Sequence, residues 1–310
     1  MRPAPPTALE TKALKTSRPS ALRATYAGDR LYIRRAAAAT LRRRLLGWYD
    51  RSGRELPWRR TSDPYAVLVS EVMLQQTQVS RVLPAYPAFL RRFPTLAALS
   101  RATLADVLRA WSGLGYNRRA RDLHRIARLH PRALPATREA LDLLPGIGSY
   151  TAGAVSCFSR GESVAFADTN IRRVLGRVLL GRIATEREAV AFDEQLVPTR
   201  GADRWHHALM DLGATVCLVR TPRCAACPIA ADCRSRGRVV QAAPRRQAAF
   251  ATSDRRVRGR IVAELRDAPH GLRLAELRHI VGDARVARLT STLQAEGLVS
   301  RKRGGVRLSD

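Results

Sequence analysis

Residues 70–79 read SEVMLQQTQV, and they end the longer run YAVLVSEVMLQQTQV. Asp63 and Pro64 precede this run, and they suit an N-cap and the first position of a helix. We therefore predict a buried helix here. The surrounding chain, from about residue 37 to 235, shows short helical patterns separated by proline and glycine, with few strand signals. This pattern predicts an all-α fold.

The predicted helix carries a polar seam. Glu71, Gln75 and Gln78 fall on one stripe at 100° per residue, with apolar residues on both sides. Apolar surroundings disfavour the charged form of a carboxylic acid, so we expect the pKa of Glu71 to be raised and its side chain to carry a proton. The exposed edge of an amphipathic helix is the alternative interpretation.

The composition favours a protein that binds a polyanion. The 310 residues are 45% hydrophobic, enough to bury a core, and the formal net charge is +29. Codon bias can explain why arginine outnumbers lysine 52 to 3, but it does not explain 55 basic against 26 acidic residues. Nucleic acid is the first candidate partner of so basic a chain. Apolar runs of membrane-spanning length and a signal-peptide pattern are missing, so we expect no membrane partner.

Changes in composition divide the chain into four segments. Residues 1–36 predict a basic disordered tail, for which a transit peptide or a misassigned start codon are alternatives. Residues 37–235 form the helical domain, residues 236–254 a linker rich in arginine, alanine and glutamine, and residues 255–310 a small module. Helices are predicted at 103–111, 117–129, 137–143, 149–159, 169–180, 188–197 and 202–214.

The C-terminal module resembles a winged helix. RRVRGRIVAELRDA, RLAELRHIV and ARVARLTSTLQAEG predict three amphipathic helices, and LVSRKRGGVRLSD predicts a strand, a Gly-Gly turn and a second strand. Arg301, Lys302 and Arg303 would lie in this hairpin, where a wing meets phosphates. A solvated basic turn is the alternative.

Four of the five cysteines lie within 17 residues, as C-x6-C-x2-C-x5-C. Such clustering predicts a metal site rather than disulfides, and four thiolates can hold either zinc or a [4Fe–4S] cluster. The ligands would be Cys217, Cys224, Cys227 and Cys233. Cys157 lies far away in an apolar helix, so we predict that it is a buried core residue.

Two further motifs point to chemistry on nucleic acid. LPGIG, residues 144–148, predicts a tight turn between two helices, whose backbone N–H groups either face a phosphate or only connect the helices. FADTNIRRVLGRVLL places Asp168 at a helix start, where capping would lower its pKa and keep it ionised. One carboxylic acid and one carboxylate are the pair that cleaves a glycosidic bond through an oxocarbenium-like transition state.

These motifs, in this order, resemble the helix-hairpin-helix DNA glycosylases. Within that superfamily SEVMLQQTQV, WSGLGYNRRARDLH, LPGIGSYTAGAV, DTNIRRVLGR, ALMDLGATVC and the four-cysteine loop are similar to the MutY-type adenine DNA glycosylases. The resemblance covers about residues 40–235. It implies a two-lobed all-α fold that binds double-stranded DNA with mismatched or oxidised base pairs, and a [4Fe–4S] cluster rather than zinc.

The resemblance also implies roles for individual residues. Glu71 would protonate the adenine leaving group, and Asp168, with Asn170 beside it, would stabilise the sugar cation. Trp58, Arg59, Leu74 and Asp211 match the adenine pocket, although many relatives have Glu at the position of Asp211. Gln76 matches a residue that enters the base stack, and Tyr116 a wedge beside it. Thr77, Gln78, Leu114, Gly146 and Gly148 match further DNA-binding positions.

Two departures bear on the substrate. Many relatives carry a C-terminal Nudix-type domain that reads 8-oxoguanine, whereas a winged-helix-like module is predicted here. Tyr150 stands where bifunctional endonuclease III relatives have a catalytic lysine, so we group it with the catalytic residues. The three lysines, Lys12, Lys15 and Lys302, all lie outside the helical domain, which predicts a monofunctional enzyme.

The leading hypothesis is a base-excision repair enzyme that hydrolyses adenine opposite 8-oxoguanine or guanine. A thymine or uracil glycosylase for G·T or G·U mismatches is the neighbouring alternative, favoured by Tyr150. A non-catalytic DNA-binding regulator is the alternative of another class, and the presence of both Glu71 and Asp168 argues against it. We expect a monomer in the bacterial cytoplasm, associated with the nucleoid.

Overall fold

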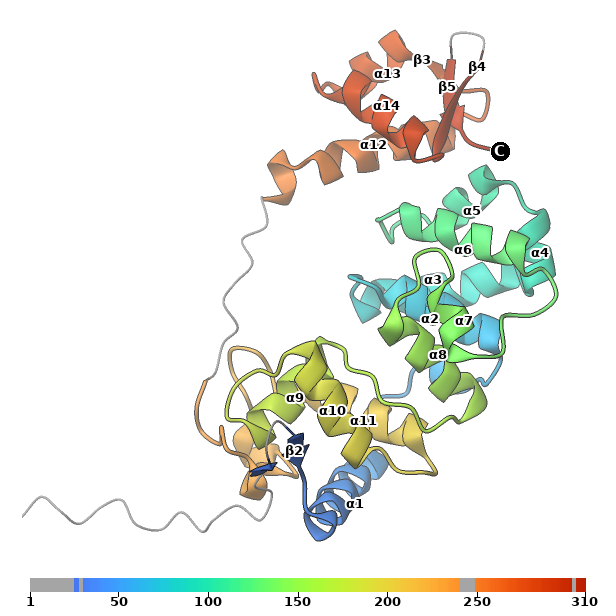
Figure 1. Cartoon of the computed structure of the whole chain (residues 1–310). Helices are drawn as coiled ribbons and strands as arrows, with labels where there is room; N and C mark the ends of the chain where they lie inside the picture. Colours follow the sequence, from blue (N-terminus) through green and yellow to red (C-terminus); the bar gives the residue numbers. More distant parts are fainter. Residues whose placement is uncertain (1–24, 28–29, 240–248, 303–304) are drawn as a thin grey trace, which may run out of the picture. The chain divides into compact units, whose positions relative to one another are not determined.

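The computed structural model describes residues 25–27, 30–239, 249–302 and 305–310 (Figure 1). Contacts between Cα atoms divide the chain into two interleaved units. Unit 1 comprises residues 1–53, 167–197 and 204–242, and unit 2 comprises residues 54–166, 198–203 and 243–310. Helices dominate both units, as predicted.

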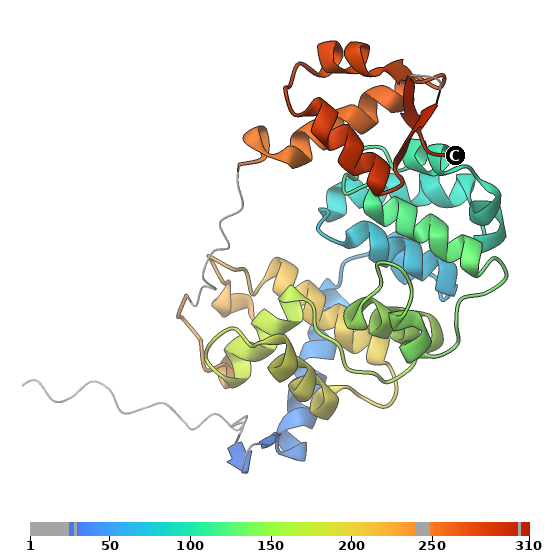
Figure 2. The ribbon, with the colours of Figure 1, turned by 45° about the horizontal axis from the view of Figure 1, so that its top comes forward.

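Unit 2 is built around one central helix. This helix, α2, packs against α3, α6 and α8, and Figure 2 shows the helices of this unit from a second direction. The helices of the first part of unit 2 are α2 (Pro64–Leu74), α3 (Val79–Arg92), α4 (Leu96–Arg101), α5 (Leu104–Ala110), α6 (Arg118–Leu129), α7 (Arg138–Asp142) and α8 (Ser149–Arg160), and a short 3-10 helix, η1, spans Pro57–Arg59.

The sequence of α2 explains its central place. The Asp63 carboxylate accepts hydrogen bonds from the backbone N–H groups of Tyr65 (3.2 Å) and Ala66 (3.3 Å). Pro64, at the first helical position, has no backbone N–H that would need an acceptor. Every residue of α2 from 65 to 73 is buried. A helix that is apolar on all sides belongs in the middle of a domain.

The end of α2 differs from the prediction. The helix stops at Leu74, and Gln76 has a left-handed backbone with φ of 54°. Gln75 and Gln78 therefore do not continue the helical stripe that begins at Glu71, and the predicted polar seam is wrong beyond residue 74. Residues 75–78 form a loop between α2 and α3 instead.

Unit 1 contains a second core. Its elements are β1 (Thr25–Ala27), β2 (Arg30–Tyr32), α1 (Arg35–Ser52), α9 (Thr169–Leu179), α10 (Glu186–Leu196) and α11 (Ala202–Thr215), followed by two 3-10 turns, η2 (Cys224–Ala226) and η3 (Ala230–Asp232). Trp205, Phe192 and Leu45 are fully buried in this core. The core supports the start of α9 and the cysteine loop that follows α11.

The start of the chain differs from the predicted tail. Residues 1–24 and 28–29 lie outside the described residues, but β1 and β2 pair antiparallel. Ile33 is buried in the core of unit 1, and its backbone N–H donates to Gln195 Oε1 at 2.8 Å. Burial of Ile33 thus extends order into the segment assigned to the tail.

The C-terminal module of unit 2 comprises three helices and a three-stranded sheet. The strand order is β3-β5-β4, all antiparallel. Beyond the predicted helices and hairpin, the short strand β3 adds an edge. The elements are η4 (Phe250–Thr252), α12 (Asp254–Asp267), β3 (Leu272–Arg273), α13 (Leu274–Val281), α14 (Val286–Ala295), β4 (Val299–Lys302) and β5 (Gly305–Leu308). The predicted hairpin turn at 303–304 lies outside the described residues.

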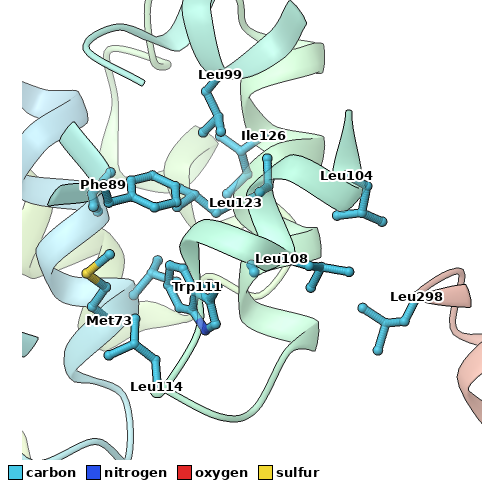
Figure 3. Close-up of a cluster of buried hydrophobic side chains, with 14 of the residues drawn as sticks. Met73, Phe89, Leu99, Leu104, Leu108, Trp111, Leu114, Leu123, Ile126 and Leu298 are labelled. Carbon is cyan, nitrogen blue, oxygen red and sulfur yellow. The ribbon is translucent and has the colours of Figure 1, made fainter. Parts of the chain in front are cut away.

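The C-terminal module packs on α5 and α6. Leu298 belongs to the same hydrophobic cluster as Leu104 and Leu108, and its side chain points toward them (Figure 3). Arg109 Nε donates to the carbonyl of Arg266 at 3.5 Å, and α12 contacts α5. Among the described residues, no helix combines the length and the hydropathy that crossing a membrane requires.

Candidate active site

Glu71 lies at the start of the last turn of α2, four residues before the loop 75–78. Its side chain is buried, with 6% of the residue exposed, and Val72 and Met73 beside it belong to the buried core. A carboxylic acid in such a place can act as a proton donor if it is protonated. The predicted position of Glu71 in apolar surroundings is confirmed.

Arg119 of α6 fastens the end of α2. Its Nη1 donates to the carbonyls of Val72 (2.8 Å), Met73 (2.9 Å) and Gln75 (2.5 Å). The last carbonyls of a helix have no partner inside the helix, so a cation there supplies the missing hydrogen bonds and complements the helix dipole. Burial lowers the pKa of Arg119 to about 10, which leaves the guanidinium charged at neutral pH.

The same guanidinium also joins a second loop. Arg119 Nη2 donates to Thr77 Oγ1 (2.9 Å) and to the carbonyls of Leu114 and Gly115 (both 3.1 Å). Thr77 Oγ1 also lies 3.3 Å from the Leu114 carbonyl oxygen. Arg119 therefore holds the loops at 75–78 and 113–117 together.

Each of these two loops presents one strained residue. Gln76 (φ 54°) and Tyr116 (φ 48°) are the non-glycine residues with positive φ in the described part of the chain. Both side chains are exposed, Tyr116 to 42%. Such backbone angles are uncommon outside glycine, and they occur often at functional sites. The predicted neighbourhood of Gln76 and Tyr116 is present, because both line one cavity.

The LPGIG segment connects α7 and α8 in a helix-hairpin-helix. Gly146 has φ of 74°, and an added Cβ would lie 3.1 Å from Asp122 Oδ2, so a larger residue would be strained there. Gly148 is the N-cap of α8. The backbone N–H groups at this helix start suit a phosphate. Gln75 Nε2 lies 3.4 Å from Thr151 Oγ1 of α8, which links the hairpin to the loop after α2.

Four other predicted residues of unit 2 have defined places. Trp58 of η1 is buried and packs edge-on against Tyr86, with ring centroids 5.6 Å apart. Arg59 Nη1 donates to the carbonyl of Arg54 at 2.9 Å. Tyr150 at the start of α8 is half-buried and packs edge-on against Phe166 at 5.5 Å. Leu74, the last residue of α2, packs against the core of the unit.

In unit 1, Asp168 caps α9 as predicted. Its Oδ1 accepts from the backbone N–H of Ile171 at 2.7 Å, and its Oδ2 accepts from Asn170 Nδ2 at 2.8 Å. The predicted direction of its pKa is wrong. Burial raises the pKa of Asp168 more than the hydrogen bonds from Ile171 and Asn170 and the charge of Arg173 lower it. Its ionised form therefore depends on these donors.

A chain of hydrogen bonds continues from Asp168 to the first cysteine of the loop. Arg173 Nη2 donates to Asn170 Oδ1 and to the carbonyl of Gly213, both at 2.7 Å. Arg173 Nε donates to the carbonyl of Cys217 at 2.8 Å. A Cβ at Gly213 would lie 2.6 Å from Asn170 Cβ, so this glycine lets α11 approach α9. Asp211, two residues before Gly213 on α11, is fully buried.

The four predicted cysteine ligands line one cavity in unit 1. Arg177, itself 2% exposed, donates to the carbonyls of Leu218 and Val219 at 2.7 Å and lies 3.4 Å from Cys217 Sγ. Burial, with repulsion from the neighbouring thiols, raises the pKa of Cys227 to about 11. In the described part of the chain no three histidine, cysteine or acidic side chains are arranged to hold a single metal ion. Cys157 is a fully buried core residue, as predicted.

Sequence reasoning missed the arginines that organise these sites. Arg119 and Arg173 occupy helical positions in segments full of other arginines, and each has among its partners a backbone carbonyl 40 or more residues away. A pattern of side chains cannot reveal such partners. The predicted wedge motif WSGLGYNRR does contain Arg119, but only the three-dimensional structure distinguishes it from Arg118.

Comparisons with known proteins agree with this geometry. Residues 69–198 match the model of the HhH-GPD superfamily base excision DNA repair proteins. The chain is 45% identical to an adenine DNA glycosylase of Mycobacterium tuberculosis (strain CDC 1551 / Oshkosh), with 83% of this chain and 89% of the relative covered, and 42% identical to one of Mycolicibacterium smegmatis, with 84% and 93% covered. A solved structure of a thermostable thymine-DNA glycosylase is 26% identical to this chain, with a TM-score of 0.59. The match covers 64% of this chain and 95% of the glycosylase chain. The chain therefore belongs to the MutY family of adenine DNA glycosylases within the HhH-GPD superfamily.

Proposed function

We propose that the protein hydrolyses the N-glycosidic bond of adenine mispaired with 8-oxoguanine or guanine and leaves the DNA backbone intact. The observation that carries this proposal is the buried Glu71 at the end of α2, beside two loops that Arg119 locks together. The 45% identity to an adenine DNA glycosylase supports adenine as the base.

The chemistry needs two carboxyl groups with different protonation. Adenine inside a duplex cannot reach a buried acid, so it is first flipped out, which costs a few kcal/mol. Protonated Glu71 then donates its proton to the adenine as the bond between the sugar carbon and the base nitrogen breaks. Ionised Asp168 stabilises the positive sugar. Water then adds to the sugar carbon, its released proton returns Glu71 to the acid form, and the products are an abasic site and free adenine.

Asn170 and Arg173 act by positioning Asp168. The amide of Asn170 donates to one carboxylate oxygen, and Arg173 fixes that amide from the other side. The hydrogen bond from Asn170 and the charge of Arg173 both favour the ionised carboxylate against the effect of burial. Trp58, Arg59, Leu74 and Asp211 would form the adenine pocket, as the family resemblance implies.

A [4Fe–4S] cluster would be held by the four cysteines. Four thiols around one cavity suit a cluster, whose iron would relieve the repulsion among neighbouring thiolates. The cluster would hold the loop 217–233 in shape. Arg177 would anchor the loop through the carbonyls of residues 218 and 219.

Contacts to DNA phosphates would come from several elements, in the helical domain and in the C-terminal module. The hairpin at Gly146 and Gly148 would bind one phosphate of the duplex. The C-terminal module has the helices and the antiparallel sheet of a winged helix, and this architecture supports a second DNA contact.

The test is base release from a panel of duplexes. A·8-oxoG and A·G should yield free adenine, whereas G·T and G·U should yield neither thymine nor uracil. Release of thymine or uracil alone would establish the mismatch glycosylase instead. Binding without release from any duplex would indicate a regulator.

A further inference from the structure

The C-terminal module contains a helix-turn-helix. Helix α13 ends at Val281, α14 begins at Val286, and residues 282–285 join them. Gly282 has φ of 64°, a left-handed conformation that ends α13 sharply. In DNA-binding proteins, two helices joined by such a short turn place the second helix in the major groove. Helix α14 has the position of that second helix.

Helix α14 is amphipathic, and its outer side is polar. Val286 and Leu293 are buried in the hydrophobic core of the module. Arg288, Ser291 and Gln294 are exposed. Because these three residues are spaced three apart, they follow one another along the same side of the helix. Arginine binds phosphates and serine and glutamine bind phosphates or base edges, so this side suits a DNA groove.

The hairpin extends this polar side. Strand β4 packs against α14 and forms one edge of the sheet. Arg301 of β4 is exposed, and its Nη2 donates to Ser291 Oγ at 3.3 Å. This hydrogen bond brings a guanidinium of the hairpin next to the outer side of α14. We call the surface formed by Arg288, Ser291, Gln294 and Arg301 the α14–β4 face.

The charge of the module favours a polyanion as the occupant of this face. Residues 254–310 contain 13 arginine and lysine residues against 7 aspartate and glutamate residues, a net charge of +6. Arg288 pairs with Asp254 at 2.8 Å, but both side chains are exposed, and a pair in water contributes little. Its guanidinium can therefore turn to a phosphate. Arg301 takes part in no ion pair with another described residue.

The module is fixed to the helices that carry the catalytic acid. The carbonyl of Glu296, one residue after α14, accepts from Arg121 Nη1 of α6 at 2.5 Å. Leu298 belongs to the same hydrophobic cluster as Leu104 of α5 (Figure 3). The α14–β4 face is thus part of the same unit as Glu71. A surface held in this way binds DNA without the cost of ordering a tether.

The α14–β4 face is separate from the loops that would surround the mispair. The cavity beside the loops 75–78 and 113–119 is lined by Leu293 and Glu296, which lie on the other side of α14. The four residues of the α14–β4 face are not among its lining residues. A duplex that contacts both places would therefore meet the face outside the mispair.

We propose that the α14–β4 face binds the duplex on one flank of the mispair, with α14 against the major groove and Arg288 and Arg301 on phosphates. This inference rests on the proposed function, which makes duplex DNA the substrate. Phosphate contacts carry no sequence information, so the added affinity is the same for every flanking sequence. They also depend on salt, because each one releases counterions from the DNA.

The experiment measures the binding constant of the full-length protein over a range of salt concentrations. One duplex is fully paired, and the other has 8-oxoguanine opposite 2′-fluoro-adenosine, whose fluorine destabilises the sugar cation and prevents cleavage. Arg288→Ala and Arg301→Ala should each reduce the slope of the logarithm of the binding constant against the logarithm of salt by about 0.9, the value of one phosphate contact. The reduction should be equal on both duplexes. Arg301→Lys keeps the charge and should keep the slope.

Arg273→Ala is the matched control. Arg273 is also an exposed arginine of the sheet, but it lies on β3, the edge opposite β4. This variant loses the same charge and should keep the wild-type slope. All these side chains are exposed, so thermal unfolding should be unchanged. Slopes of Arg288→Ala and Arg301→Ala that equal that of Arg273→Ala would overturn the proposed contact. A reduction confined to the mispaired duplex would also overturn it, because the contact would then lie at the mispair.

Adenine release by the wild-type protein is measured in parallel on a cleavable A·8-oxoG duplex. Release together with equal slopes of all variants overturns the flanking contact and leaves the proposed function standing. Reduced slopes of Arg288→Ala and Arg301→Ala on both duplexes, without any adenine release, support the contact and overturn the proposed function.

Discussion

Asp168 shows how two opposing effects on one carboxyl group set a working range of pH. Burial raises its pKa above the ordinary value near 3.8, and the hydrogen bonds from Ile171 and Asn170 and the charge of Arg173 oppose this shift. The native state therefore holds the proton more tightly than the unfolded state, so the stability that this group contributes at low pH is lost as pH rises through the raised pKa. The ionised form needed for catalysis lowers the stability of the fold.

The first prediction concerns this residue. Base release should fall on the acid side as pH drops through the raised pKa of Asp168, because the protonated acid cannot stabilise the sugar cation. Asp168→Asn should reduce single-turnover release about 10²–10³-fold at neutral pH and remove that acid limb. Glu194→Gln, an exposed acid of the same unit, is the control and should leave the profile unchanged. An acid limb that persists in Asp168→Asn would assign it to another group.

At the scale of elements, the join between α2 and α6 determines where the catalytic acid sits. Arg119 supplies hydrogen bonds to the last carbonyls of α2 and to the loop of Tyr116. We predict that Arg119→Ala lowers the free energy of unfolding by about 3 kcal/mol, because several buried carbonyls lose a charged donor. Base release should fall as well, since the loops are no longer held. Arg118→Ala removes an exposed neighbouring arginine and should leave thermal stability unchanged. Equal melting temperatures of the Arg119→Ala and Arg118→Ala variants would show that Arg119 does not hold α2 and the two loops together.

The start of α2 could be predicted from sequence, and its end could not. Asp63 and Pro64 are local signals for a helix start. No glycine or proline marks the end after Leu74, which depends on Arg119, 45 residues further along the chain. Pro84 and Pro87 are local signals for a helix break, yet both lie inside α3, so the local pattern does not reveal this helix.

The candidate site, like α2, could be predicted from the sequence only in part. The residues of the quoted motifs, from Glu71 to Cys233, follow from the family resemblance, and the cap at Asp168 follows from local sequence. The direction of the Asp168 pKa did not follow, because burial depends on how α9 and α11 pack. Gln76 and Phe250 line one cavity although they lie far apart in the sequence, and a pattern along the chain does not show such proximity.

At the scale of the whole molecule, the distribution of lysine limits the reaction. A strand-cleaving lyase of this superfamily needs an amine to form a Schiff base, and residues 16–301 contain no lysine. We predict abasic DNA that stays uncut until alkali or heat is applied, measured on denaturing gels. Borohydride should trap little protein on the DNA. Efficient trapping that survives removal of residues 1–15 would contradict this prediction.

The iron cluster is a second prediction at this scale. Purified protein should be yellow-brown with broad absorption near roughly 400 nm, as thiolate-bound iron–sulfur clusters are. Cys227→Ser should lose this colour and stability together, because the loop 217–233 is held by its ligands. Cys157→Ser, a cysteine outside the loop, should keep the colour. A colourless wild-type protein with one zinc per chain would refute the cluster.

The most direct measurement is single-turnover release of adenine from an A·8-oxoG duplex by the wild-type protein and by Glu71→Gln. The variant keeps the shape of the buried side chain but has no proton to donate. Wild-type protein should liberate free adenine, and Glu71→Gln should do so about 10²–10⁴-fold more slowly with nearly unchanged duplex affinity. Release by Glu71→Gln at a rate close to that of the wild type, or no adenine from the wild type, would contradict the role assigned to Glu71.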